Sequence, residues 1–166
     1  MGPLATLLGR QSVRGSISKI GNKVGAYHGS PSAFNKFRLD KIGSATDSGM
    51  FGEGFYFAGR KKDALPYMRG PNGNIKQVDL DIRNPLVLNN SRDIPEIIVP
   101  NKTLEHMRDA PKNYSKKFRD YLIDNDYDGV VDNIRKRHSQ IVALYPEQIS
   151  IRPTFADYMA QLGRMR

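Results

Sequence analysis

The sequence predicts an α+β domain, in which strands and helices mix without a regular βαβ repeat. Residues 75–82 alternate apolar and polar side chains, which is typical of a half-buried strand. Residues 114–123 place Phe118 and Leu122 at helical spacing, with lysine, arginine and aspartate on the opposite face. Residues 140–144 form a short apolar run that fits a late, buried strand. These three segments set the fold class.

The remaining elements follow from local composition. Glycine and serine dominate 43–49, which predicts a loop, and Pro66 limits the regularity of a helix over 63–68. Asn84 and Pro85 end one strand before the next begins. In chain order, we expect a strand at 24–28, a turn or short helix at Phe34 and Phe37, the 43–49 loop, a strand at 52–57, the 63–68 helix, strands at 75–82 and 86–88, the 114–123 helix, a strand at 128–131, the 140–144 strand, a turn at 146–148 and a terminal helix at 154–166.

At 166 residues, one domain is the expectation. Residues 1–23 are rich in glycine, serine and basic side chains and are expected to be a basic N-terminal extension. The compact domain is expected over 24–152, followed by a helical tail over 153–166. The terminal helix would place Tyr158 and Leu162 on one face.

The composition restricts the kinds of ligand and partner that the protein can bind. The chain has a formal net charge of +9 and no cysteine, so disulfides and thiolate metal sites are excluded. The three histidines, His28, His106 and His138, are far apart in sequence, and we expect no metal. No apolar run approaches the ~20 residues of a membrane span, so no membrane partner is expected. The basic residues, with a cluster at 135–137, favour phosphate, nucleic acid or an acidic surface, although solubility alone also explains them.

The most informative motif is Met50-Phe51-Gly52-Glu53-Gly54-Phe55-Tyr56-Phe57-Ala58. Glycine permits positive φ or a close backbone approach to a ligand. In a strand, Phe55 and Phe57 would face the core and Tyr56 would face the other side, toward a cleft. Tyr67 follows Tyr56 by eleven residues and is expected to return to the same cleft. A second motif, His28-Gly29-Ser30, lies upstream on the expected early strand.

This order and spacing of motifs resembles the diphtheria-toxin-like ADP-ribosyltransferases, the group that includes the poly(ADP-ribose) polymerases. The segments Phe34-Asn35-Lys36-Phe37 and Lys41-Ile42-Gly43 are more similar still to the phage-type ADP-ribosyltransferase domains of polyvalent proteins. The resemblance covers about 27–151. It implies two packed, mainly antiparallel sheets with flanking helices, and NAD as the substrate.

The resemblance also implies a role for each motif residue. His28 would bond a hydroxyl of the adenosine-side ribose and orient NAD, and Ser30 would support His28 or a ribose hydroxyl. The backbone of Gly29 would bond the carboxamide of nicotinamide. Tyr56 and Tyr67 would stack on the two faces of the nicotinamide ring. Taken alone, each of these residues also fits an ordinary place in a protein core.

The third motif departs from the family pattern. Polymerases of the family begin a late strand with a catalytic glutamate, and this chain has Gln140 there. Glutamine bonds ribose hydroxyls but lacks the negative charge that stabilises an oxocarbenium-like transition state. We therefore expect transfer of a single ADP-ribose and no chain elongation. Ala64 stands where many polymerases have a carboxamide-binding serine, and Glu53 and Glu147 are interpreted as surface charges.

The predicted function is an NAD-dependent mono-ADP-ribosyltransferase of phage or mobile-element type that modifies a host protein, with His28, Tyr56 and Gln140 as catalytic residues. The alternative is a catalytically weak or inactive virion protein with the same fold, whose basic ends bind DNA or a capsid, portal or tail partner. A third alternative is an NAD glycohydrolase, in which water replaces the acceptor. These hypotheses place the protein in the virion or the cytoplasm of the bacterial host.

Overall fold

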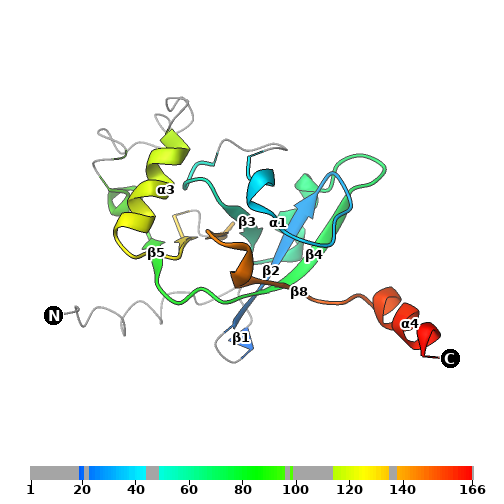
Figure 1. The fold of residues 1–166 in the computed structure, drawn as a ribbon. Coiled ribbons are helices and arrows are strands. Elements are labelled where there is room, and N and C mark those ends of the chain that lie inside the picture. Colours follow the sequence, from blue (N-terminus) through cyan, green and yellow to red (C-terminus); the bar gives the residue numbers. More distant parts are fainter. Residues whose placement is uncertain are drawn as a thin grey trace.

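The computed structural model of the chain describes residues 19–20, 23–43, 49–95, 98, 114–134 and 138–165 (Figure 1). Eight strands belong to one sheet: β1 (Lys19–Ile20), β2 (Lys23–Ser30), β3 (Phe55–Ala58), β4 (Asn74–Leu80), β5 (Pro85–Leu88), β6 (Gly129–Asp132), β7 (Gln140–Ala143) and β8 (Ile149–Ile151). The described helices are α1 (Lys61–Ala64), α3 (Tyr114–Asp124) and α4 (Phe155–Arg164), with the 3₁₀ turns η3 (Leu39–Lys41), η4 (Leu65–Tyr67), η5 (Ser91–Asp93) and η6 (Pro146–Gln148).

The strand order is β5-β6-β7-β3-β2-β4-β8, and β1 pairs with β2 outside this path. Among the described pairs, β5 and β6 are parallel and the rest are antiparallel. The prediction of an α+β fold is confirmed. The finer prediction of two packed sheets is not, because hydrogen bonding runs through a single sheet. Its two halves, β5-β6-β7-β3 and β2-β4-β8, are joined where Tyr27 pairs with Ala58.

Two apolar clusters lie on the two faces of this sheet. Residues alternate across a strand, so on β7 Val142 belongs to one cluster while Ile141 and Ala143 belong to the other. The first cluster is covered by α3, which buries Tyr114, Phe118 and Leu122 along one stripe. The second brings together β2, β3, β4 and β7, and its aromatic members come from β3 and from the segment after β2: Phe34, Phe37, Phe55 and Phe57.

The strand β3 explains why phenylalanine and tyrosine alternate in the segment Phe55-Tyr56-Phe57. Phe55 and Phe57 are buried in the second cluster, as predicted, and Tyr56 packs toward the first. The loop before β3 bends sharply, because Gly49 and Gly52 both adopt positive φ, at 73° and 96°. A Cβ on Gly54 would lie 2.5 Å from the side chain of Val142, so glycine lets the loop lie directly on β7.

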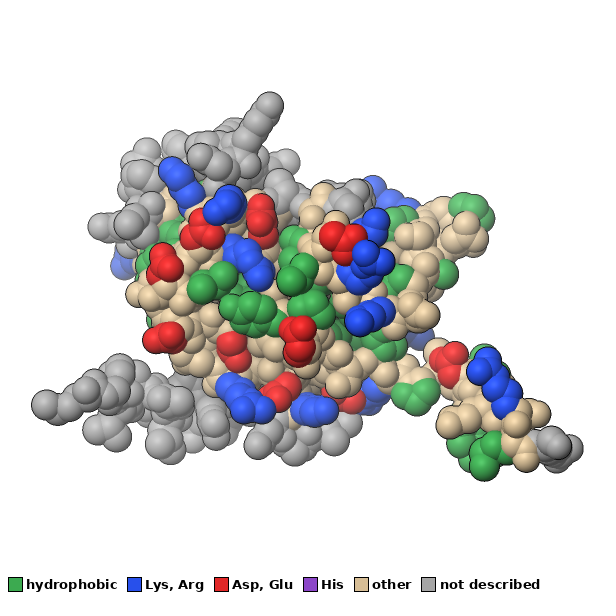
Figure 2. Space-filling view, viewed as in Figure 1, with side chains coloured by type: hydrophobic (Ala, Val, Ile, Leu, Met, Phe, Trp, Pro, Cys, Tyr) green, Lys and Arg blue, Asp and Glu red, His purple; other side chains and the backbone are tan. Residues whose placement is uncertain are grey.

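The chain ends differ in how they join this domain. Lys19 and Ile20 of β1 belong to the predicted basic extension, and they pair with Val24 and Lys23 of β2. Residues 1–18 lie outside the described residues. The domain boundaries at 23 and 152 stay predictions. The predicted terminal helix is present as α4, capped by reciprocal hydrogen bonds between Thr154 and Asp157. It extends away from the sheet in Figure 1, and Figure 2 shows hydrophobic side chains gathered on one side of it.

Candidate functional site

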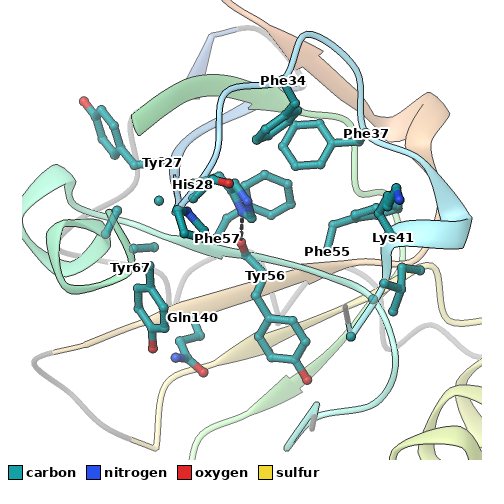
Figure 3. Close-up of a pocket in the computed structure, with 18 of the residues that line it drawn as sticks. Tyr27, His28, Phe34, Phe37, Lys41, Phe55, Tyr56, Phe57, Tyr67 and Gln140 are labelled. Atoms are coloured by element: carbon teal, nitrogen blue, oxygen red, sulfur yellow. Dashed lines mark hydrogen bonds between the residues drawn. The ribbon is translucent and has the colours of Figure 1, made fainter. Parts of the chain in front are cut away.

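The fold brings all six predicted site residues to one pocket of about 1010 Å³. They come from four elements: His28, Gly29 and Ser30 from β2, Tyr56 from β3, Tyr67 from η4, and Gln140 from the start of β7. This volume is at the upper end of the roughly 300–1,000 Å³ range of small-molecule sites. Figure 3 shows Tyr56, Tyr67 and Gln140 pointing in the same direction, below His28 in that view.

The pocket exists because two neighbouring strands diverge. Strand β2 pairs with β4 along its whole middle and end, from Val24 to Ser30. On its other side, the β3 register includes only Tyr27, opposite Ala58. From His28 onward, the backbone of β2 therefore moves away from β3, and the motif lies at the mouth of the gap.

His28 is held in one tautomer. Its Nδ1 lies 2.8 Å from the carbonyl oxygen of Tyr56, a group that only accepts, so Nδ1 carries the proton and Nε2 is the acceptor. The rings of Phe34, Phe37 and Phe57 surround the imidazole at centroid distances of 5.7, 5.1 and 5.6 Å (Figure 3). Burial lowers the pKa of His28 below its usual value, against the hydrogen bond to Tyr56. At neutral pH, His28 is thus a neutral hydrogen-bond acceptor.

The structure adds a reason for glycine at position 29 that the sequence did not show. A Cβ there would lie 2.2 Å from the carbonyl oxygen of Ala64 and 2.9 Å from Cβ of Tyr67. Glycine thus lets β2 touch the turn from α1 to η4, and this contact places Tyr67 beside the motif. Ser30 accepts a hydrogen bond from the amide of Ser32 and donates to its carbonyl, so its hydroxyl holds the turn that leaves β2.

The hydroxyl of Tyr56 is fixed by two hydrogen bonds to the loop before β3. It accepts a hydrogen bond from the amide of Phe51 at 2.9 Å and donates to the carbonyl of Gly52 at 2.8 Å. The same loop is tied to α3, because Arg119 donates to the carbonyl of Glu53 at 2.8 Å. Arg119 also donates to the carbonyl of Leu144 at 3.0 Å, which joins the loop to the end of β7. The ring of Tyr56 therefore has little freedom to rotate away from the pocket.

Tyr67 is more exposed than Tyr56, and Gln140 lies within the sheet. Tyr67 ends the short turn η4, and 38% of its surface is exposed. Gln140 opens β7, with Ala58 opposite it on β3 and Asp132 opposite it on β6. Since directly opposite residues share a face of a sheet, Gln140 and the buried Asp132 are side-chain neighbours.

The sequence prediction missed a polar cluster in the same lining. Nδ1 of His138 lies 3.1 Å from one carboxylate oxygen of Asp63, and the other oxygen accepts from Arg60 at 2.7 Å. Both His138 and Asp63 line the pocket. Burial raises the pKa of Asp63, but the hydrogen bonds from Arg60 and His138 outweigh it and hold the pKa below its usual value. The hint in the sequence is that His138 stands two residues before Gln140.

The charged lining is mostly basic. Four basic side chains from the segment after β2 and from α1 line the pocket: Lys36, Arg38, Lys41 and Lys62. Two acidic residues, Glu53 and Asp63, share it. Such an excess attracts anionic ligands, and a dinucleotide pyrophosphate carries the charge that would be favoured. Within the described part of the chain, no group of three or more histidine, cysteine, aspartate or glutamate residues has a metal-binding arrangement.

None of the described helices is long and apolar enough to cross a membrane.

The model of the family described as "ADP-Ribosyltransferase in polyvalent proteins" matches residues 19–151. The solved "Crystal structure of an anti-CRISPR protein" is 16% identical, over 78% of this chain and 94% of that chain, with a TM-score of 0.43. No curated protein sequence matches the chain.

Proposed function

Because this chain belongs to the ADP-ribosyltransferases of polyvalent proteins, we propose that it transfers one ADP-ribose from NAD to a protein of the bacterial host. The observation that supports this most is the common pocket of His28, Tyr56, Tyr67 and Gln140. These residues come from four separate elements and meet where β2 and β3 diverge. A family of phage or mobile-element type is consistent with a host target.

The lining suits the chemical groups of NAD. Tyr56 and Tyr67 offer two aromatic rings to a nicotinamide ring, and stacking contributes about 0.5–1.5 kcal/mol per pair beyond buried area. Nε2 of His28 is an acceptor suited to a ribose hydroxyl. The lysine and arginine side chains of the lining suit the pyrophosphate. We therefore assign NAD to this pocket as the substrate.

In the proposed reaction, NAD supplies a positively charged nicotinamide as a good leaving group. Tyr56, locked by its two hydroxyl bonds, holds that ring in one orientation. His28 fixes the ribose that bears the adenine. Gln140 donates or accepts hydrogen bonds at the ribose hydroxyls without adding a negative charge. Single transfer follows, because nothing at Gln140 activates a growing ADP-ribose chain.

The proposal is tested first by binding. NAD should raise the melting temperature by mass action, by an amount equivalent to about 2.7 kcal/mol at a concentration 100 times Kd. Tyr56→Ala should remove this response, while the circular dichroism spectrum stays that of a folded domain. Incubation with labelled NAD and a host lysate should then label a discrete protein. An absence of any NAD response at millimolar concentration would contradict the proposal.

Gln140 also favours a second candidate, a virion structural protein that keeps the fold without the chemistry. Removal of one preorganised charge at such a site costs about 2.7–4 kcal/mol of transition-state stabilisation. In this candidate, the basic residues 1–23 bind DNA or another virion protein. Purified virions that contain the chain, together with a pocket that does not respond to NAD, would favour it. Labelling of a host protein would favour the enzyme.

A further inference from the structure

The pocket contains a histidine–carboxylate pair that the proposed function has not used. His138 donates from Nδ1 to Asp63 at 3.1 Å, because an ionised carboxylate only accepts. This fixes the tautomer and leaves Nε2 as an acceptor. The His138 side chain is 64% exposed, whereas that of Asp63 is 9% exposed. The pair thus has one buried, anchored partner and one partner that a substrate can reach.

Asp63 is itself held in place. Arg60 donates to its second carboxylate oxygen at 2.7 Å, and Asp63 lies within the short helix α1. The arrangement therefore runs from Arg60 through Asp63 to His138, with each side chain oriented by the one before it. A base that is oriented by a carboxylate is the arrangement by which hydrolases and transferases activate a hydroxyl.

The position of the pair complements what Gln140 lacks. His138 precedes Gln140 by two residues, and the extended pairing continues between them, since Gly59 donates to the carbonyl of Ser139 at 3.3 Å. His138, Ser139 and Gln140 all line the pocket. His138 thus provides a proton acceptor two residues before Gln140, whose amide does not act as a base.

We propose that His138 is the general base that takes the proton of an acceptor hydroxyl, and that Asp63 positions it. This inference rests on the proposed function. The acceptor oxygen bonds to C1′ of the nicotinamide ribose, while the C1′–N bond breaks and its electron pair goes to the ring nitrogen. Neutral nicotinamide leaves, and the hydroxyl proton passes to Nε2 of His138. The resulting imidazolium ion keeps its Nδ1–H bond to Asp63 until it returns the proton to solvent.

The acceptor class follows from this assignment. A carboxylate nucleophile has no proton to give at neutral pH and gains nothing from a base. A hydroxyl of serine, threonine or water does need one, and general-base assistance contributes typically about 10²–10⁴-fold. The inferred acceptors are therefore hydroxyl groups, with water as the acceptor that is always present.

The test uses the full chain, NAD and water, with nicotinamide release measured by chromatography. His138→Ala should lower kcat about 10²–10⁴-fold and leave Kd for NAD unchanged. Added imidazole should restore part of the lost rate in His138→Ala but none in Gln140→Ala. Asp63→Asn, nearly isosteric, should lower kcat with little change in KM. The matched control is Asp81→Asn, which breaks the pair between Asp81 and Arg83 outside the pocket lining and should keep the wild-type rate.

The outcomes separate the two proposals. Wild-type turnover that survives His138→Ala, or a lost rate that imidazole leaves unchanged, overturns the base while the proposed function stands. A wild type that binds no NAD and releases no nicotinamide overturns both. A wild type that binds NAD, labels a host protein on carboxylates and is indifferent to His138→Ala overturns both the base and the inferred hydroxyl acceptor, while the proposed function stands.

Discussion

Two histidines line the same pocket in opposite surroundings. His28 lies among three phenylalanine rings and bonds a backbone carbonyl, whereas His138 is exposed and bonds the carboxylate of Asp63. We call these surroundings the aromatic part and the charged part of the lining. Both fix the imidazole in the tautomer with the proton on Nδ1. They differ in what happens when Nε2 takes a second proton.

A positive charge is unfavourable in the aromatic part, whereas the charged part places the Asp63 carboxylate beside the imidazole. Burial disfavours the charged form of His28, so this residue suits hydrogen bonding to a ligand without proton transfer. An imidazolium at His138 would face the Asp63 carboxylate and open solvent. The comparison assigns binding to one part of the lining and proton chemistry to the other.

The largest effect is expected from restoring a carboxylate. Gln140→Glu should raise nicotinamide release about 10²–10³-fold, because it adds the charge that a preorganised site lacks. It should also weaken the dependence on His138, since the new carboxylate can accept the proton. The double variant Gln140→Glu/His138→Ala, measured against both single variants, checks this. Strictly additive effects would show that the two positions act on different steps.

The next effect comes from the contact of β2 with the turn after α1, which lies between the two parts of the lining. Gly29→Ala should cost about 1–3 kcal/mol of unfolding free energy, because its Cβ would meet the backbone oxygen of Ala64 at 2.2 Å. The shift should also move Tyr67 and lower NAD affinity. Urea unfolding measures the change in unfolding free energy, and titration measures the affinity for NAD. Gly163→Ala on α4 is the matched control, since nothing lies within 4 Å of its added Cβ.

The sequence predicted local elements well and long-range contacts poorly. The helix around Phe118 and the strand at 140–144 were predicted within two residues of their ends, because each pattern is complete in one short segment. The single sheet was not predicted, since its two halves join at one pairing, Tyr27 with Ala58, that leaves no mark in either segment.

The same limit applies to the site. The resemblance supplied His28, Tyr56, Tyr67 and Gln140, and the fold brings them to one pocket. The pair of Asp63 and His138 was missed because its partners are 75 residues apart and His138 follows a basic run that suggested a charged surface. The expected role of the Gly29 backbone stays a prediction, and nothing in the sequence indicates that a Cβ there would also meet the turn at Ala64.

A smaller effect concerns the lock on Tyr56. Tyr56→Phe removes the bonds to Phe51 and Gly52 and should cost about 1 kcal/mol of unfolding free energy. The ring that would stack on nicotinamide remains, so NAD affinity should stay near that of the wild type. Tyr56→Ala should lose both the two hydrogen bonds and the affinity for NAD. If Tyr56→Phe weakens NAD binding as much as Tyr56→Ala does, the hydroxyl contacts the ligand and the assignment of Tyr56 to stacking is wrong.

The smallest expected effect is the pH dependence that His28 gives to stability. Its pKa in the folded state lies below the usual 6.5, so between these two values the unfolded chain binds more protons than the folded chain. Stability should therefore fall as pH drops through about 6.5 and level off below the folded pKa. His28→Gln should flatten this part of the curve, measured as unfolding free energy in urea between pH 8 and 5. At pH 8 the imidazole is neutral in both states, so the comparison there isolates packing from protonation. A variant that keeps the wild-type slope would show that His28 takes a proton in the folded state as readily as in the unfolded chain, and the two parts of the lining would then not differ in the way proposed.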